Sequence, residues 1–330
     1  MPETPFSAPL TISAAGREFL ARAEPLRRID LAPEAMAATR RAICASVASA
    51  GVAVQTALGV SVSGGEVADV PVQWITPQTG GGAGVVLYFF GGGHITGSPE
   101  EDLAITARLA HLSGARVCAP WYRLAPEHPY PAGVEDGWAV YRALAGPHLA
   151  LAGESAGGNL CLTLLCRAAA AGLAMPAAVA LLSPWCDLTH QGDTIRTLDG
   201  VDPTLDYPNI LSQMAKAYAG GLPLDLPEIS PLFAAIPPGF PPALISTGTR
   251  DLLLSDCARL AARLRHAGVP VDMRVAEGMW HVFEYYPELP EALDSLQGIA
   301  TFLRQHLDRA RVCGYPLSGT NTAEQRKPRQ

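Results

Sequence analysis

Lysine is almost absent from this sequence of 330 residues, in which only Lys216 and Lys327 occur. Several chemistries need a lysine at a defined position, among them a Ser-Lys dyad, a Schiff base with a carbonyl substrate, and phosphate binding by a P-loop. The scarcity of lysine disfavours all three.

Charged residues as a class are also scarce, at 17% of the chain. The 31 acidic and 24 basic residues give a formal net charge of -7, and the basic residues are scattered singly or in pairs. A nucleic-acid-binding surface concentrates arginine and lysine on one face. We therefore expect no nucleic-acid partner.

Long apolar runs and paired cysteines are missing as well. No uninterrupted apolar run approaches the roughly 18 residues of a membrane-spanning helix, and the first residues lack the basic and apolar regions of a signal peptide. The seven cysteines contain no C-x-x-C pair, which suits reduced thiols better than a disulfide framework. These absences predict a soluble, cytoplasmic protein without membrane association.

Hydrophobic residues make up 48% of the chain, enough for a sheet that is buried on both faces. From residue 70 onward, short β-like runs alternate with helical stretches, which predicts an α/β fold with a mostly parallel sheet and helices on both faces. Seven strands are predicted, over residues 70–76, 85–90, 115–121, 148–152, 179–183, 242–247 and 269–276.

Two segments fall outside this alternation and are predicted to form a helical cap. Residues 1–50 show helical periodicity, and residues 187–231 are too long for an ordinary loop, with one helical run over 210–218. The α/β-hydrolase catalytic domain would then comprise residues 51–186 and 232–312. The polar, aperiodic residues 313–330 are predicted to be a disordered tail.

A G-x-S-x-G motif, Gly153-Glu154-Ser155-Ala156-Gly157, lies between a predicted strand and a predicted buried helix. In that setting the glycines allow a sharp turn that exposes the serine hydroxyl. Ser155 is therefore the candidate nucleophile.

A serine nucleophile on such a turn needs a general base and an acid that orients the base, in the chain order Ser, Asp or Glu, His. Of the three histidines after residue 200, only His281 lies in a loop directly after a predicted strand. Asp251 follows the preceding strand in the same way, whereas Asp256 is predicted to cap the next helix. Asp251 would fix the tautomer of His281 and stabilise its charged form.

A glycine-rich loop after an early strand can supply the other half of an oxyanion hole. Gly91-Gly92-Gly93 follows the predicted strand 85–90, and it opens neither a G-x-G-x-x-G motif nor a P-loop. We expect the backbone N–H groups of Gly91, Gly92 and Ala156 to stabilise an oxyanion.

A series of further motifs resembles the hormone-sensitive-lipase-like (bacterial family IV) esterases of the α/β-hydrolase fold. These motifs are Tyr88-Phe89-Phe90-Gly91-Gly92-Gly93, Tyr122-Arg123-Leu124-Ala125-Pro126-Glu127-His128-Pro129, Gly153-Glu154-Ser155-Ala156-Gly157-Gly158-Asn159, Ser183-Pro184-Trp185, Ser230-Pro231-Leu232, Gly248-Thr249-Arg250-Asp251 and Gly278-Met279-Trp280-His281-Val282-Phe283. They span residues 88–283 in the order that the family shows.

The resemblance implies an eight-stranded sheet, a helical cap, and a serine carboxylesterase that hydrolyses short-chain acyl esters through an acyl-enzyme intermediate. It implies no cofactor, and we expect no metal. The family also suggests a possible homodimer through edge strands, and structural roles for Arg123 and Glu127 in a buried stretch near the nucleophile. Two residues depart from the family pattern: Phe90 stands where the family has His, and Glu154 where it often has Asp or Thr.

The substrate pocket is expected to include large side chains in or beside the cap and two residues of the glycine loop. These residues are Phe90, His94, Trp185, Tyr207, Met214 and Phe240. A lactonase or an amidase would use the same three catalytic residues and stays open as an alternative. A non-catalytic ligand-binding homologue also stays open, although the presence of His281 argues against it.

Overall fold

A sheet of eight strands forms the centre of the molecule in the computed structural model, which describes residues 7–22, 30–79, 82 and 84–312. The spatial order of the strands is β1-β2-β4-β3-β5-β6-β7-β8. β1 and β2, and β2 and β4, pair antiparallel, and all other neighbours are parallel. The predicted α/β-hydrolase sheet is thus confirmed. The strands are β1 (Ser61–Val67), β2 (Val70–Thr76), β3 (Val85–Phe89), β4 (Arg116–Pro120), β5 (Leu149–Glu154), β6 (Val179–Leu182), β7 (Ala243–Gly248) and β8 (Val271–Ala276).

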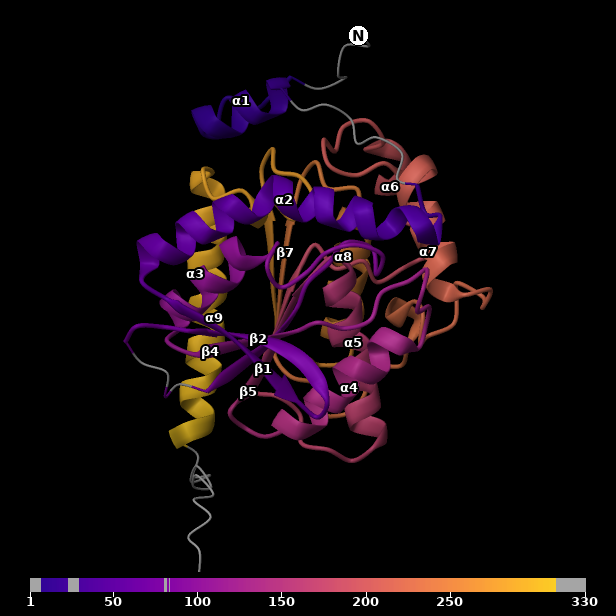
Figure 1. The fold of residues 1–330 in the computed structure, drawn as a ribbon. Helices are drawn as coiled ribbons and strands as arrows, with labels where there is room; N and C mark the ends of the chain where they lie inside the picture. The colour runs from indigo at the N-terminus through magenta and orange to yellow at the C-terminus, as the bar shows by residue number, and fades with distance from the viewer. Residues whose placement is uncertain (1–6, 23–29, 80–81, 83, 313–330) are drawn as a thin grey trace, which may run out of the picture.

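Helices cover both faces of this sheet (Figure 1). On one face, α3 (Leu103–Ser113) packs beside α9 (Pro290–Val312). The other face carries α4 (Ala132–Leu144), α5 (Ala156–Ala170) and α8 (Leu254–His266). The central helix α5 is buried along nearly its whole length, as expected for a helix with Arg167 as its only charge.

The parallel strands point toward helix α2 (Pro33–Leu58), which crosses above their carboxyl ends, with α1 (Ala14–Arg22) beyond it (Figure 1). At one end of α2 lie α6 (Thr194–Thr197), the π-helical turn η1 (Tyr207–Leu211) and α7 (Ser212–Ala219). The remaining short turns are η2 (Pro231–Phe233) and η3 (Phe283–Tyr285). The helical run predicted over 210–218 therefore exists, although it begins in η1.

A buried apolar cluster, here called the cap cluster, joins the segment 187–231 to the carboxyl edge of the sheet. It consists of Met36, Ile95, Ala125, Ala156, Trp185, Leu188, Ile195, Ile210, Leu211, Met214, Ala215, Tyr218, Ala219, Ile229, Leu252 and Leu253. A second and larger cluster, here called the main core, fills the layers between the sheet and its helices.

Because α2 runs without a break to Leu58, the boundary predicted at residue 50 falls inside a helix. The division into cap and catalytic domain stays a prediction.

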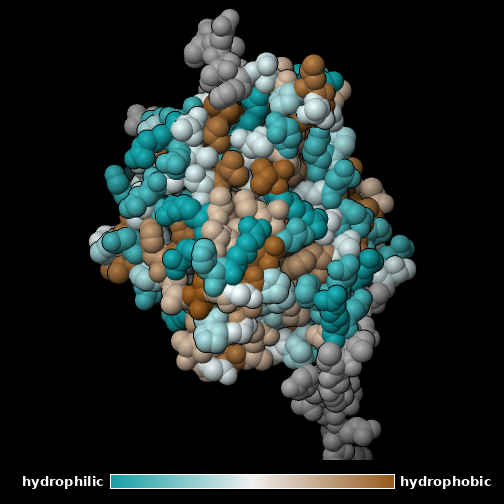
Figure 2. Space-filling model, turned by 180° about the vertical axis from the view of Figure 1, so that it is seen from behind, coloured by the Kyte–Doolittle hydropathy of each residue, from teal (hydrophilic) through white to brown (hydrophobic). Residues whose placement is uncertain are grey.

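The surface mixes polar and apolar side chains. Figure 2 shows hydrophobic residues in small groups between hydrophilic ones on the face opposite to that of Figure 1.

At the sheet edge, β8 exposes Val275, but the homodimer stays a prediction. Residues Glu34–Leu58 of α2 are long and apolar enough to cross a membrane by length and composition alone, and this stretch is mostly unburied. The prediction of no membrane association therefore stays untested.

The six cysteines within the described residues are free thiols, as predicted: Cys44, Cys118, Cys161, Cys166, Cys186 and Cys257. Cys313 and the predicted tail, residues 313–330, lie outside the described residues.

Candidate active site

Ser155 occupies the sharp turn between β5 and α5. Its backbone has φ 51° and ψ −116°, a combination that non-glycine residues rarely adopt and that costs energy unless neighbours hold it. Two hydrogen bonds fix this turn: the N–H of Ser155 donates to Leu182 O (2.9 Å), and its carbonyl accepts from the N–H of Trp185 (3.0 Å). The sequence motif and the local structure thus agree.

The glycines that flank Ser155 are needed for close packing. A Cβ on Gly153 would lie 2.6 Å from the carbonyl carbon of Gly157, and a Cβ on Gly157 would lie 1.9 Å from Phe89 O. No side chain fits at such distances. The two glycines let the start of α5 approach the end of β3, where the glycine loop begins.

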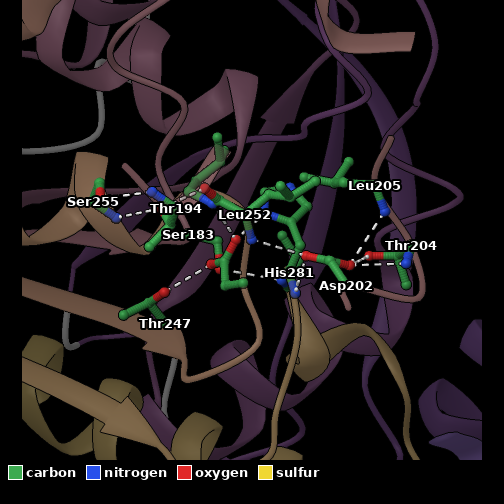
Figure 3. A network of polar contacts seen from close by, with 12 residues as sticks. Ser183, Thr194, Asp202, Thr204, Leu205, Thr247, Leu252, Ser255 and His281 are labelled. Atoms are coloured by element: carbon green, nitrogen blue, oxygen red, sulfur yellow. Dashed lines mark hydrogen bonds and ion pairs between the residues drawn. The ribbon is translucent and has the colours of Figure 1, made fainter. Parts of the chain in front are cut away.

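Asp251 and His281 lie directly after the neighbouring strands β7 and β8, and their side chains meet. Nδ1 of His281 is 3.1 Å from Oδ1 of Asp251, and both side chains are buried. The carboxylate of Asp251 also accepts from the hydroxyl of Thr247 (2.7 Å) and the N–H of Leu253 (2.8 Å) (Figure 3). The structure therefore brings together the two residues that the sequence order pairs.

The two partners shift each other's pKa. Burial alone would raise the pKa of Asp251, but the charge and hydrogen bond of His281, with further hydrogen bonds from Ser183 and Leu253, lower it. Burial lowers the pKa of His281, but the charge and hydrogen bond of Asp251, with the charges of Asp202 and Glu284, raise it overall. Such a pair favours the imidazolium that forms when the ring accepts a proton.

Ser155 lies at the same edge of the sheet as this pair. Strands β5, β6, β7 and β8 are consecutive parallel neighbours, so their carboxyl ends meet there. Ser183, which follows β6, contacts both β7 and the loop after β8. Its N–H donates to Ser246 O (2.7 Å), and its hydroxyl accepts from the N–H of Val282 (3.1 Å), the residue after His281.

The glycine loop supplies free backbone donors, but the prediction for Gly91 is wrong. The N–H of Gly91 donates to the carboxyl group of Glu154 and cannot also bind an oxyanion. Within the part of the chain that the structure describes, no hydrogen bond uses the N–H of Gly92 or Gly93, at φ 83° and 64°. The N–H of Ala156 opens α5, where the first donors lack partners within the helix.

Glu154 is itself unusual, because it is a buried carboxyl group directly before the candidate nucleophile. Burial, and then the charge of Asp102, raises its pKa well above the usual range, against the effect of the Gly91 N–H. Asp102 in turn accepts from the hydroxyl of Tyr88 (2.6 Å). Glu154 therefore serves as a buried acceptor under the glycine loop.

Phe90 belongs to the main core, so its assignment to the substrate pocket is wrong. Its ring stacks on Tyr122 at 4.2 Å between centroids, and its side chain is fully buried. The carbonyl of Phe90 accepts from the Tyr122 hydroxyl (2.7 Å). A planar apolar ring fits this stack without an unpaired polar atom, which explains how Phe can stand in place of His.

Four of the predicted pocket residues do lie around the cap cluster. Trp185 and Met214 are members of it, Tyr207 packs against it, and His94 stacks on Tyr218 at 3.8 Å. Met214 also covers the glycine loop, because a Cβ on Gly93 would lie 2.3 Å from its Sδ.

Phe240 is not near the site, and its assignment to the pocket is wrong. It precedes the start of β7 and packs in the main core, whereas Asp251 follows the end of the same strand. A strand of this length spans roughly 20 Å, so Phe240 lies at the opposite edge of the sheet.

Two supporting predictions have mixed outcomes. Asp256 is not a cap: α8 begins at Leu254, and the buried carboxylate of Asp256 instead accepts from the N–H of Asp187 (3.0 Å). Arg123 pairs with Asp136 (2.8 Å) and Glu127 with Arg40 (2.7 Å), contacts that suit structural roles. Both pairs are partly exposed, so the stretch around them is less buried than predicted.

One carboxylate at this site was missed from the sequence. Asp202, from the segment 187–231, accepts hydrogen bonds from the backbone N–H groups of Leu252 (3.1 Å) and His281 (3.3 Å) (Figure 3). Nothing in its local sequence, Gly-Val-Asp-Pro-Thr, distinguishes it from an ordinary turn residue.

Comparisons with known proteins agree with this geometry. A family model described as the alpha/beta hydrolase fold matches residues 86–285. An acetyl-hydrolase of Streptomyces hygroscopicus is 35% identical over 70% of this chain and 79% of its own length. The putative acetyl-hydrolase LipR of Mycobacterium tuberculosis is 32% identical over 74% of this chain and 80% of its own.

Solved structures give the same picture. The crystal structure of an esterase, E25, superposes with a TM-score of 0.84 at 29% identity and covers 91% of this chain and 96% of that one. A hormone-sensitive lipase from a metagenome library superposes with a TM-score of 0.78 at 33% identity, over 89% and 96% of the two chains.

Proposed function

Because the chain belongs to the α/β-hydrolase family and is a carboxylic ester hydrolase of the hormone-sensitive-lipase-like type, we propose that it cleaves short-chain acyl esters through an acyl-enzyme on Ser155. The observation that carries this proposal is the buried contact of 3.1 Å between His281 and Asp251, at the sheet edge that also bears the strained turn of Ser155.

In the proposed reaction, Oγ of Ser155 attacks the acyl carbonyl carbon while Nε2 of His281 takes the hydroxyl proton. The bond from the carbonyl carbon to the alcohol oxygen breaks, and the imidazolium returns the proton to that oxygen. Water then attacks the acyl-enzyme with the same proton transfers. The acid leaves, and the Ser155 hydroxyl is restored.

The oxyanion of each tetrahedral intermediate would be held by the N–H groups of Gly92, Gly93 and Ala156. The first two have no other hydrogen-bond partner within the described residues, and the third lies at the positive end of α5. Gly91 would act indirectly, by anchoring the loop to Glu154.

The packing of the cap cluster supports a preference for short acyl groups. Ala156, next to the nucleophile, is packed in the same cluster as Trp185 and Met214, which leaves little room for a long chain. Two relatives are named acetyl-hydrolases, which also favours a small acyl group.

The test is a panel of p-nitrophenyl esters from acetate to octanoate, together with p-nitroacetanilide and a γ-lactone, assayed with wild type and Ser155→Ala. We expect acetate and butyrate esters to be cleaved fastest, and Ser155→Ala to lose activity by several orders of magnitude. Faster cleavage of the anilide or the lactone would favour the amidase or lactonase alternative. Equal turnover of acetyl and octanoyl esters would reject the short-acyl proposal.

A further inference from the structure

Asp202 lies in the segment between β6 and β7, yet its carboxylate reaches the ends of both β7 and β8. One oxygen, Oδ2, accepts from the N–H of Leu252 at 3.1 Å and from the N–H of His281 at 3.3 Å. Leu252 directly follows Asp251. A single oxygen atom therefore holds the backbone next to the acid and the backbone of the base (Figure 3).

The second oxygen of Asp202 is equally occupied by donors. Oδ1 accepts from the N–H and the hydroxyl of Thr204, both at 2.8 Å, and from the N–H of Leu205 at 3.2 Å. The side chain is 4% exposed, so water contributes little. All of these partners can donate, so a carboxylate, which only accepts, satisfies them. The amide of an asparagine would instead direct its own N–H groups at some of these donors.

Asp202 also places a second negative charge beside His281. Burial, followed by the charge of Asp251, raises the pKa of Asp202 to about 6, against the effects of His281 and the backbone donors of Thr204 and Leu252. Within the described residues, other titratable groups also face this site. Glu284 helps to raise the pKa of His281, Tyr286 faces Asp202, and Asp256 and Cys257 face Asp251.

From this geometry we infer that Asp202 is a positioning residue, through which the segment 187–231 fixes the Asp251 and His281 loops relative to each other and favours the protonated imidazole during catalysis. The inference rests on the proposed function, because it gives His281 the part of the base. The Ser155→Ala assay tests that function separately.

A purely structural anchor of the cap would make the same hydrogen bonds, so the test must detect the charge. The first variant is Asp202→Asn, which keeps the size of the side chain. We expect kcat for p-nitrophenyl acetate to fall by about tenfold or more with a smaller change in KM, because misplaced donors disturb the pair. Loss of the negative charge should also move the acid limb of the kcat/KM profile to lower pH.

Asp206→Asn is the matched control, since it removes a carboxylate from the same segment. Among the residues that the structure describes, the side chain of Asp206 accepts only from Asn209, and it caps the start of η1. Its profile should keep the wild-type acid limb. An equal shift in Asp206→Asn would overturn the inference, because the effect would then be general to the cap.

If Asp202→Asn does not fold, the variant Thr204→Val tests the role of Asp202 instead. This variant removes one donor from Asp202 and keeps the branched shape of the side chain. The carboxylate is then less readily ionised, so the acid limb of the kcat/KM profile should again move to lower pH, by a smaller amount than in Asp202→Asn. The inference is wrong if the folded variant, Asp202→Asn or failing that Thr204→Val, keeps both the wild-type acid limb and kcat within about twofold. If Ser155→Ala is inactive in that case, the proposed function survives.

Discussion

The backbone N–H of Gly91 donates to the carboxyl group of Glu154, the residue directly before the candidate nucleophile Ser155. This contact ties the first residue of the glycine loop to the end of β5. From the other side, the Tyr122 hydroxyl donates to the carbonyl of Phe90. The loop is thus held at both of these residues, which leaves the N–H groups of Gly92 and Gly93 free to bind an oxyanion.

The role of Glu154 can be tested with a matched pair of variants. Glu154→Gln keeps an oxygen that accepts from Gly91 and should retain most of the wild-type kcat. Glu154→Leu removes the acceptor, and we expect a loss of kcat that approaches the factor of about 10² to 10³ found when an oxyanion donor is lost. Steady-state kinetics with p-nitrophenyl acetate gives the comparison. Equal kcat values for the two variants would show that the contact does not matter.

The pH dependence of kcat/KM should report on His281. Only the neutral ring can accept the Ser155 proton, so activity should rise with pH as the imidazolium loses its proton. Because Asp251 and Asp202 raise the pKa of His281, the midpoint should lie above the ordinary histidine value of about 6.5. Asp251→Asn removes the main cause and should move the midpoint down while strongly lowering the rate. A wild-type midpoint below about 6.5 would contradict the argument.

Phe90 and His94 should respond differently to substitution. Phe90→His places a polar ring in the stack with Tyr122, and we expect it to lower the free energy of unfolding by about 1 to 3 kcal/mol without changing acyl preference. His94→Phe keeps the stack on Tyr218. Burial lowers the pKa of His94 to about 3, so no charge is lost and the fold should stay stable. Urea unfolding and the acetyl-to-butyryl rate ratio distinguish the two cases. A hundredfold gain for every ester in Phe90→His would mean that the native loop is poorly formed.

Met214 and Phe240 offer a second contrast, because both were expected to line the pocket. Met214→Ala opens space beside Gly93 and should raise the octanoyl-to-acetyl rate ratio. Phe240→Ala leaves a cavity at the far edge of the sheet and should cost about 3 to 5 kcal/mol of unfolding free energy with that ratio unchanged. A change of ratio in Phe240→Ala would contradict its placement.

The sheet and the candidate catalytic residues could be predicted because their signals are local. Ser155 lies in a motif that needs glycines for packing, and Asp251 and His281 each follow a predicted strand. Strand β1 gave no such signal: it carries Gly64 and Gly65, and its residues are mostly exposed. An edge strand with little buried surface needs no apolar alternation.

The rest depended on contacts that the sequence does not display. In the sequence Gly91 is equivalent to Gly92 and Gly93, and the contact of its N–H with the Glu154 carboxyl sets it apart from them. Phe240 is close in sequence to the segment 187–231, but it precedes the start of β7 and so lies at the edge of the sheet opposite to the site. Asp202 meets its partners only after the chain has returned through β7 and β8.

The hydrogen bonds of Asp202 to Leu252 and His281 span 50 and 79 residues of chain. Closing such long loops costs chain entropy, and only the contacts that form once the loops are closed offset this cost. After dilution from denaturant, we therefore expect esterase activity to return later than the circular dichroism signal of the sheet and its helices, with Asp202→Asn abolishing that delay.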